Sequence, residues 1–207
     1  MITLAMPKGR VLDEAVALFA RAGLDLSALK ANTRKLIFDF AKAELRVMVV
    51  RDSDVPTYVE YGAADLGIAG RDILDEQGRD LYEPLDLGIG KCRLSAAEPV
   101  DQKARPGADG HLRYATKYPN LTRRWLEKKG IVADVIKLYG SIELAPLTGL
   151  ADRIVDLVST GETLKQNRLR EVETLMPVSA RLVVNRAALK LRQGPIETLL
   201  ARLRPKG

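Results

Sequence analysis

The chain has 207 residues, enough for one large domain or two small ones around a sizeable core. With 46% hydrophobic and 29% charged residues, it has the composition of an ordinary soluble globular protein. The 33 Lys and Arg exceed the 27 Asp and Glu and give a formal charge of +6, which suits an anionic partner. Because acidic residues are mixed among the basic ones and aromatics are only 5%, a small polyanion is favoured over nucleic acid.

Membrane insertion and disulfide bonding are not expected. The longest apolar runs, such as LRVMVV at 45–50, are far too short to span a bilayer. Met1 leads directly into an apolar run without a basic segment or cleavage site, so no signal peptide is recognisable. The single cysteine, Cys92, excludes an internal disulfide. We therefore expect a cytoplasmic protein without a membrane partner.

The N-terminal part of the chain predicts alternating strands and helices. ITLAMP at 2–7 indicates a strand, and a helical pattern follows from KGR until Gly23 ends it. The segments 36–40 and 45–50 predict a hairpin. A helix should follow with Asp54 as its N-cap, Pro56 inside and Gly62 at its end. ADLGIAG then indicates a buried strand, GRDILDEQG a short helix, and DLGIGKCR another strand.

The second half restarts the same pattern after a linker-like or hairpin-tip loop at 99–110. The expected elements are strands at 112–116, 132–139 and in ADRIVDLV, a helix at 119–129, a short helix in ELAPL, a β-rich segment from 172, and two C-terminal helices. This alternation favours an α/β protein with largely parallel sheets. We expect two α/β lobes around a central cleft, lobe I comprising 1–90 and 178–207 and lobe II comprising 91–177, with ligands at the C-terminal ends of strands.

The stretch DRIVDLVSTGETL, residues 152–164, carries the clearest sign of a binding site. A buried strand runs into a hydroxyl-rich turn and then a helix start, an arrangement that favours phosphate. The alternative is that Thr160 is merely an N-cap and Gly161 only lets the chain turn. Asp152 and Asp156 favour the first interpretation, because carboxylates beside a phosphate site commonly bind sugar hydroxyls or a metal. An activated sugar phosphate would use all of these features.

The segment ELAPLTGLADRIVDLVSTGETL at 143–164 resembles the characteristic motif of the ATP phosphoribosyltransferases. The matching positions are Glu143, Gly149, Ala151, Ile154, Asp156, Thr160, Gly161, Thr163 and Leu164. MPKGR near the N-terminus, RDSDVPTYVEYGAADLGIAGRD at 51–72, ATKYPNLTR at 115–123 and GSIE at 140–143 agree with the same family. The resemblance therefore covers nearly the whole chain.

The resemblance implies an enzyme that condenses ATP with phosphoribosyl pyrophosphate to N1-phosphoribosyl-ATP and pyrophosphate, using Mg²⁺, in the first step of histidine biosynthesis. It also implies a fold of the type II periplasmic-binding-protein kind. Lobe I would serve the nucleotide and pyrophosphate, and lobe II the phosphoribosyl group. Asp152 and Asp156 would face the ribose hydroxyls or the metal. The sugar 5-phosphate would lie on Ser159, Thr160, Gly161, Glu162, Thr163 and Leu164.

The remaining implied site residues are mostly cationic. Lys8 and Arg10 would act at the nucleotide and pyrophosphate end, with Gly9 allowing close approach of the main chain to phosphate. A solvated Arg10 is the alternative, but a cation at a helix N-terminus is electrostatically unfavourable, which supports a ligand role. Arg34 would be the second arginine on the leaving group. Asp72 and Glu143 are assigned to adenosine, although each could equally be a cap or a surface carboxylate.

Several other residues are expected to be structural. Asp54 should cap its helix with Arg51 as a possible ion-pair partner, Trp125 and Cys92 should be core residues, and His111 should face solvent. The length resembles the short form of the family, which implies at least a homodimer and a hetero-octamer with a regulatory subunit similar to histidyl-tRNA synthetase. A ligand-binding module without catalysis has the same architecture and remains the main alternative.

Overall fold

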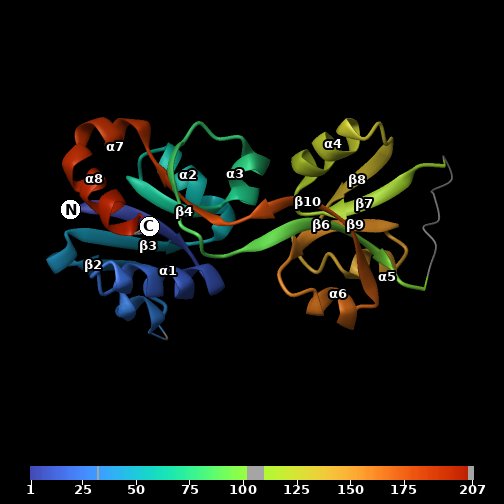
Figure 1. The fold of residues 1–207 in the computed structure, drawn as a ribbon, viewed down its shortest axis with the longest axis horizontal. Helices are drawn as coiled ribbons and strands as arrows, with labels where there is room; N and C mark the ends of the chain where they lie inside the picture. The colour runs from blue at the N-terminus through green and yellow to red at the C-terminus, as the bar shows by residue number, and fades with distance from the viewer. Residues whose placement is uncertain (32, 102–109, 205–207) are drawn as a thin grey trace. The chain divides into compact units, whose positions relative to one another are not determined.

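The computed structural model describes residues 1–31, 33–101 and 110–204, which form two compact units. The first unit comprises Met1–Leu74, Gly78–Gly90 and Ser179–Gly207, and the second comprises Asp75–Gln77 and Lys91–Val178. Figure 1 shows that both termini belong to the first unit. Most of the expected linker, residues 102–109, lies outside the described residues.

The first unit is built on a six-stranded mixed sheet in the order β2-β3-β1-β4-β11-β5. Its strands are β1 (Ile2–Pro7), β2 (Ile37–Phe40), β3 (Leu45–Val50), β4 (Leu66–Gly70), β5 (Tyr82–Asp86) and β11 (Ala180–Val184). The three central strands β3, β1 and β4 are parallel, and the outer strands are antiparallel to their neighbours.

Helices cover both faces of this sheet. They are α1 (Arg10–Arg21), α2 (Val55–Glu60), α3 (Arg71–Gln77), α7 (Arg186–Leu191) and α8 (Gln193–Leu203), with short 3-10 turns η1 (Ser27–Lys30), η2 (Ala41–Ala43) and η3 (Asp52–Asp54). The buried stripe of α1, which includes Phe19, packs with α8 on one face. Val55 and Val59 of α2 and Leu74 of α3 pack on the other. The strands β1, β4 and β11 therefore lie between two apolar layers, and almost all of their residues are buried.

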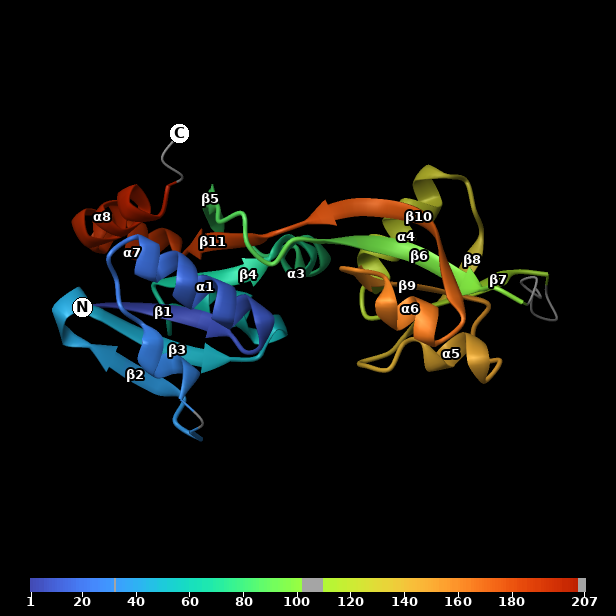
Figure 2. The same ribbon diagram turned by 60° about the horizontal axis from the view of Figure 1, so that its bottom comes forward.

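The second unit has a five-stranded sheet in the order β10-β6-β9-β7-β8. Its strands are β6 (Cys92–Pro99), β7 (Leu112–Thr116), β8 (Ala133–Lys137), β9 (Arg153–Val158) and β10 (Leu169–Val178), and its helices are α4 (Pro119–Lys128), α5 (Leu144–Leu147) and α6 (Glu162–Gln166). Strands β9, β7 and β8 are parallel, whereas β6 and β10 are antiparallel to their neighbours. Figure 2 shows α6 beside β10, and Leu164 of α6 packs against Ile154 and Val158 of β9.

The expectation of largely parallel sheets is wrong, because four strand pairings among the described residues are parallel and five are antiparallel. The expected strand at 85–94 is also wrong: β5 ends at Asp86 and β6 begins at Cys92. Gly88 and Gly90 lie between them with φ of 66° and 63°, a left-handed conformation that interrupts a strand. The two neighbouring segments consequently belong to different sheets.

Some expected structural roles also change. The Asp54 side chain makes no capping hydrogen bond to α2, and its Oδ1 instead accepts from the Ser53 hydroxyl at 3.2 Å. Trp125 is only half-buried and lies edge-on to Tyr114, with 5.9 Å between the ring centroids. Cys92 is likewise half-buried, and His111 is exposed as expected. Among the described residues, no helix has the length and apolar character needed to cross a membrane.

Candidate functional site

In the first unit, the expected cationic residues gather where the parallel strands end. Lys8, Gly9 and Arg10 directly follow β1, and β1 pairs in parallel with β3 so that Pro7 lies opposite Val50. Arg51, the residue after β3, therefore lies at the same edge of the sheet. Lys8, Arg10 and Arg51 are all exposed. The C-terminal edge of a parallel sheet is where α/β proteins bind ligands.

Arg34 reaches this same edge by a different route. Strand β2 is antiparallel to β3, with Ile37 opposite Met48, and the N–H of Val49 donates to the carbonyl of Leu36 at 2.8 Å. The start of β2 is consequently beside the end of β3. Arg34 is exposed and lies just before β2, so the topology brings this arginine to the edge that also carries Lys8 and Arg10. No local sequence feature required that result.

Gly9 and Arg10 form the junction between β1 and α1. Gly9 has φ 81° and ψ −151°, which disfavours other residues, and its carbonyl accepts from Leu12 N–H at 2.9 Å. A Cβ on Gly9 would meet nothing within 4 Å, so the conformation and not crowding requires glycine. The Arg10 guanidinium lies 3.7 Å from Glu14 one turn later and its side chain is 52% exposed. An exposed pair of this kind contributes little stability and leaves Arg10 accessible to a ligand.

Asp72 lies at the same edge of the first sheet but is buried. It is in the first turn of α3, directly after β4, and only 4% of its surface is exposed. A Cβ on Gly70 would lie 2.1 Å from the Asp72 Oδ1, so the carboxylate occupies the space above this glycine. The structure therefore brings Asp72 to the expected edge, with its carboxylate packed against the main chain.

The second unit has an equivalent edge where β7, β8 and β9 end. These strands are parallel, so Lys117, the segment after Lys137 and the turn that starts at Ser159 all lie at one edge. Glu143 is half-buried there as the residue before α5, and its side chain makes no capping hydrogen bond. The motifs ATKYPN, GSIE and STGET are far apart in sequence and come together because each follows a parallel strand.

The turn after β9 presents unpaired main-chain N–H groups. Gly161 has φ 83° and ψ 0°, and the N–H of Glu162 donates to the Thr160 hydroxyl at 3.3 Å. Ser159 and Thr160 are exposed. In the part of the chain that the structure describes, the N–H groups of Thr160, Gly161, Thr163 and Leu164 have no protein acceptor. Free N–H groups gathered in such a turn form an anion-binding concavity.

Three further residues of this segment differ in their surroundings. Asp156 is half-buried near the end of β9, and its Oδ1 accepts from the N–H of Leu157 at 2.8 Å. Leu164 is 7% exposed and packs in the core with Ile154, so only its main chain is available at the turn. Glu162 and Thr163 are exposed in the first turn of α6. This helix has five residues, so its dipole is short and the turn itself must supply most of the attraction for an anion.

Asp152 does not belong to this group, and the structure does not support its expected contact with ribose or metal. It precedes β9, so the whole strand separates it from Ser159, about 20 Å at roughly 3.3 Å per residue. Its carboxylate is buried and accepts from Arg113 three times, from the main-chain N at 2.8 Å, Nη2 at 3.1 Å and Nε at 3.2 Å.

Arg93 is the residue beside the turn that sequence reasoning missed. Its Nη1 donates to the carbonyl of Ser159 at 3.1 Å, and its Nε donates to Glu171 Oε1 at 2.7 Å. The guanidinium and the hydroxyls of Ser95 and Thr174 lower the pKa of Glu171 to about 2. No sequence signal identified this residue, because the contact joins positions 66 residues apart in the chain.

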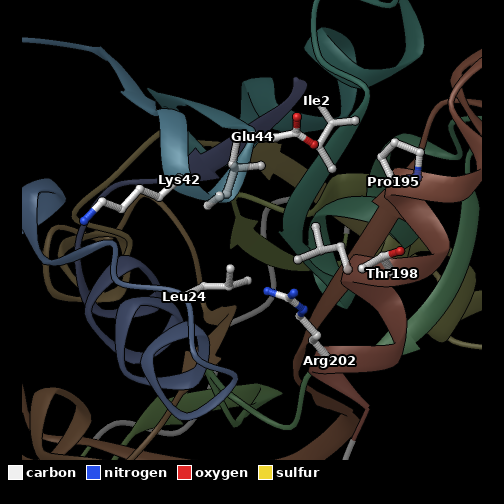
Figure 3. Close-up of a pocket in the computed structure, with 10 residues that line it drawn as sticks. Ile2, Leu24, Lys42, Glu44, Pro195, Thr198 and Arg202 are labelled. Carbon is white, nitrogen blue, oxygen red and sulfur yellow. The ribbon is translucent and has the colours of Figure 1, made fainter.

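A separate cavity of about 370 Å³ lies at the opposite edge of the first sheet, next to the starts of β1 and β3 (Figure 3). Its lining includes Ile2 and Leu45 at the starts of these strands, and Thr198 and Arg202 of α8. The length of β1 separates it from Lys8, about 20 Å. This cavity is therefore distinct from the edge that carries the expected site residues.

Sequence comparison identifies the family to which these features belong. Residues 51–205 match the HisG family, described as ATP phosphoribosyltransferase. The chain belongs to this family. It is 56% identical over 201 residues to the ATP phosphoribosyltransferase of Citrifermentans bemidjiense, covering 96% of this chain and 95% of that protein. The enzyme of Acidithiobacillus ferrooxidans is 57% identical over 205 residues, with coverage of 98% and 95%.

Solved structures agree with this family assignment and with the fold. The ATP phosphoribosyltransferase (HisG:HisZ) complex of Thermotoga maritima matches with a TM-score of 0.81 and 33% identity over 98% of this chain and 96% of that chain. The VFT2 domain of Bordetella pertussis BvgS matches with a TM-score of 0.63 and 15% identity, covering 100% and 88%. At that identity the likeness concerns the fold alone, and it confirms the expected resemblance to type II periplasmic-binding proteins.

Family membership establishes the reaction class. ATP phosphoribosyltransferases are transferases that join ATP to phosphoribosyl pyrophosphate at the first step of histidine biosynthesis, and the family uses a divalent metal. Both substrates are polyanions, in agreement with the charge of +6. The sequence-based assignment to this family is confirmed.

Proposed function

We propose that the chain carries out this transfer with two groups of residues, one in each unit. The turn from Ser159 to Leu164 binds the 5-phosphate of phosphoribosyl pyrophosphate, and Asp156 binds the ribose. Lys8, Gly9, Arg10 and Arg34 bind the pyrophosphate and the ATP phosphates, and Asp72 and Glu143 serve the adenosine. The observation that carries the proposal is the row of free N–H groups at Thr160, Gly161, Thr163 and Leu164, within a motif of the family.

The chemistry requires placement and charge stabilisation more than proton transfer. The lone pair of the adenine N1 forms a bond to the anomeric carbon while the bond from that carbon to the pyrophosphate oxygen breaks. Positive charge develops on the ribose and negative charge on the departing pyrophosphate. Cations preorganised around a leaving group lower such a barrier. The exposed Arg10 and Arg34 supply that kind of charge, and the aspartate proposed for the ribose can stabilise the positive side.

Mg²⁺ is the metal that we infer for the transfer. Among the described residues there is no cluster of three or more His, Cys, Asp or Glu side chains that could hold a metal ion. Mg²⁺ needs no such cluster, because it keeps several waters and is usually bound through substrate phosphates and one or two carboxylates. Asp156 is the carboxylate that β9 carries, three residues before the phosphate turn begins. When bound, the ion would neutralise charge on the pyrophosphate.

A regulatory subunit and a hetero-octamer belong to the same proposal. The Thermotoga maritima relative was solved as a HisG:HisZ complex, and the chain covers 95% of its curated relatives from C. bemidjiense and A. ferrooxidans. We infer that this chain also works with a HisZ-type subunit similar to histidyl-tRNA synthetase, as at least a homodimer within that assembly. The cytoplasm is the compartment in which both substrates are available.

The first experiment mixes the purified chain with ATP, phosphoribosyl pyrophosphate and Mg²⁺ and follows adduct formation by ultraviolet absorbance, with pyrophosphatase present. The same assay is repeated after addition of a HisZ-type subunit. Adduct in either arm supports the transfer. Absence of adduct in both, together with normal binding of phosphoribosyl pyrophosphate, would favour a binding module without catalysis.

The Thr160→Val variant tests the phosphate turn directly. Val removes the hydroxyl that accepts from Glu162 N–H, so we expect the affinity for phosphoribosyl pyrophosphate to fall roughly 5- to 50-fold, equivalent to about 1–2.3 kcal/mol. Thr148→Val is the matched control, because the Thr148 hydroxyl bonds only to carbonyls of its own helix. Titration calorimetry measures both. Unchanged affinity in Thr160→Val would contradict the assignment of this turn.

A further inference from the structure

The antiparallel pairing of β6 with β9 places Arg93 beside the phosphate turn. In this ladder Arg93 is opposite Val158, the last residue of β9. Directly opposed residues of an antiparallel pair point to the same face of a sheet. Val158 packs with Leu164 of α6 on the face that α6 covers. Arg93 therefore extends on that face next to Ser159, the first residue of the turn.

The Arg93 guanidinium is held in one orientation by Glu171. Nε and Nη2 donate to the two carboxylate oxygens of Glu171 at 2.7 and 2.5 Å, which is the bidentate geometry of a strong arginine–carboxylate pair. The buried Ser95 hydroxyl donates to Glu171 Oε1 at 2.7 Å, and the Thr174 hydroxyl approaches the same oxygen at 3.1 Å. Glu171 is thus fixed from two strands, and Arg93 with it.

The third contact of Arg93 determines how the turn is oriented. Nη1 donates to the Ser159 carbonyl at 3.1 Å. A peptide unit is planar and trans, so the carbonyl of Ser159 and the N–H of Thr160 point in opposite directions within one plane. Holding that carbonyl toward Arg93 consequently directs the Thr160 N–H away from Arg93, and the free N–H groups of Gly161, Thr163 and Leu164 follow in the same turn.

We propose that Arg93 is a positioning residue, which Glu171 orients, and that it fixes the Ser159–Thr160 peptide so that the N–H groups of the turn converge on the sugar phosphate. This inference rests on the proposed function of the turn. It assigns Arg93 no contact with substrate. Arg93 on β6 and Glu171 on β10 both lie outside the 143–164 motif. The proposal gives this ion pair a role at the turn that the motif alone does not indicate.

Direct binding of phosphate by Arg93 is the competing role, and the two roles predict opposite effects of Glu171→Gln. If Arg93 touched the phosphate, loss of the neighbouring carboxylate would leave the affinity unchanged or increase it, because a repelling charge is removed. If Arg93 positions the turn, Glu171→Gln loosens the guanidinium and weakens binding. We expect a 3- to 10-fold loss of affinity for phosphoribosyl pyrophosphate in Glu171→Gln.

Arg93→Lys tests the clamp itself, since Lys keeps the charge but cannot bind Glu171 and Ser159 simultaneously in a fixed plane. We expect KM for phosphoribosyl pyrophosphate to rise about 10-fold, with KM for ATP within twofold of wild type. The double variant Arg93→Lys, Glu171→Gln should be little worse than Arg93→Lys alone, because both changes break one unit. Hydrogen exchange followed by mass spectrometry should be faster in a peptide that contains residues 159–166.

Arg153→Lys is the matched control. Arg153 forms an ion pair with Glu98 on the neighbouring strand and does not touch the turn. It should change thermal stability by a similar amount while leaving KM for phosphoribosyl pyrophosphate and exchange at 159–166 unchanged. An equal rise of KM in this control, a normal KM in Arg93→Lys, or tighter binding in Glu171→Gln would each overturn the proposal. If Thr160→Val also binds normally, the proposed phosphate turn fails as well; if only Arg93→Lys is normal, the turn stands without its clamp.

Discussion

Asp152 offers the sharpest test of whether position along β9 separates a structural carboxylate from a ligand-binding one. In Asp152→Asn, one acceptor oxygen is replaced by an amide donor that faces the donors of Arg113. The wild-type carboxylate accepts three hydrogen bonds there, at 2.8 to 3.2 Å, and its side chain is 5% exposed. The substitution therefore breaks a buried ion pair and leaves a charged guanidinium without its partner.

The expected cost of Asp152→Asn is about 2–3 kcal/mol of the free energy of unfolding. Removing one partner of a fully buried pair costs roughly 3–5 kcal/mol. The Arg113 side chain is 30% exposed and also donates to the Gly149 carbonyl at 3.0 Å, so water and this carbonyl offset part of the loss. Urea unfolding measures the change. Asp134→Asn on the exposed edge of β8 is the control, expected within about 0.5 kcal/mol of wild type.

Binding of the sugar donor completes the test. Because β9 separates Asp152 from the turn, the folded Asp152→Asn variant should bind phosphoribosyl pyrophosphate within about twofold of wild type by calorimetry at a temperature well below its unfolding transition. Unchanged stability combined with a tenfold loss of affinity would refute the structural role. That result would place the carboxylate on the ligand, as the sequence alone had indicated.

Two further predictions concern Arg10 and Glu171. Arg10→Ala should lower kcat roughly 10- to 1000-fold, because one charge that stabilises the leaving group is lost. The affinity for phosphoribosyl pyrophosphate, measured by calorimetry, should largely survive. An unchanged kcat would exclude Arg10 from the reaction. Glu171 has a folded-state pKa lowered from 4.5 to about 2, chiefly by its hydrogen bonds from Arg93. The stability from this pair is present above pH 4.5 and is lost as the pH falls toward 2. Near neutral pH, Glu171→Gln should therefore lower the free energy of unfolding by about 1–2 kcal/mol, allowing for the 36% exposure of Arg93. Between pH 4.5 and about 2, the free energy of unfolding of this variant should fall less steeply than that of wild type. Equal slopes for the two proteins would contradict the lowered pKa.

The elements of the fold were predictable where one chain segment suffices to form them. The strand at 112–116 and the helix start at Arg10 follow from apolar periodicity and are confirmed. The order and direction of strands were not, because β6 and β10 are paired antiparallel through contacts that no local pattern records. For the same physical reason the linking segment at Gly88 was mistaken for a continuous strand: its apolar residues resemble β structure, and the interruption depends on glycine conformation.

The candidate site divides in the same way. The turn at Thr160 was predictable because hydroxyls, glycine and a helix start are adjacent in sequence, and a family motif marks them. The place of Asp152 at the other end of β9 was not predictable, because a sequence shows which residues neighbour a strand but not which end faces a ligand. Arg93 was missed because its function depends on register across two strands. Only the folded ladder places it opposite Val158.

The strand ends also decide how Arg51 should be regarded. From sequence, Arg51 was assigned to structure with Asp54, yet among the described residues the Asp54 carboxylate contacts Ser53 and caps no helix. Arg51 directly follows the parallel strand β3, is exposed, and lies at the edge shared with Lys8. A structural arginine needs a partner that holds it, as Glu171 holds Arg93 and Asp152 holds Arg113. In the part of the chain that the structure describes, Arg51 forms no such ion pair and is exposed at the edge shared with Lys8, so we propose that it joins the cations assigned to the polyanionic substrates.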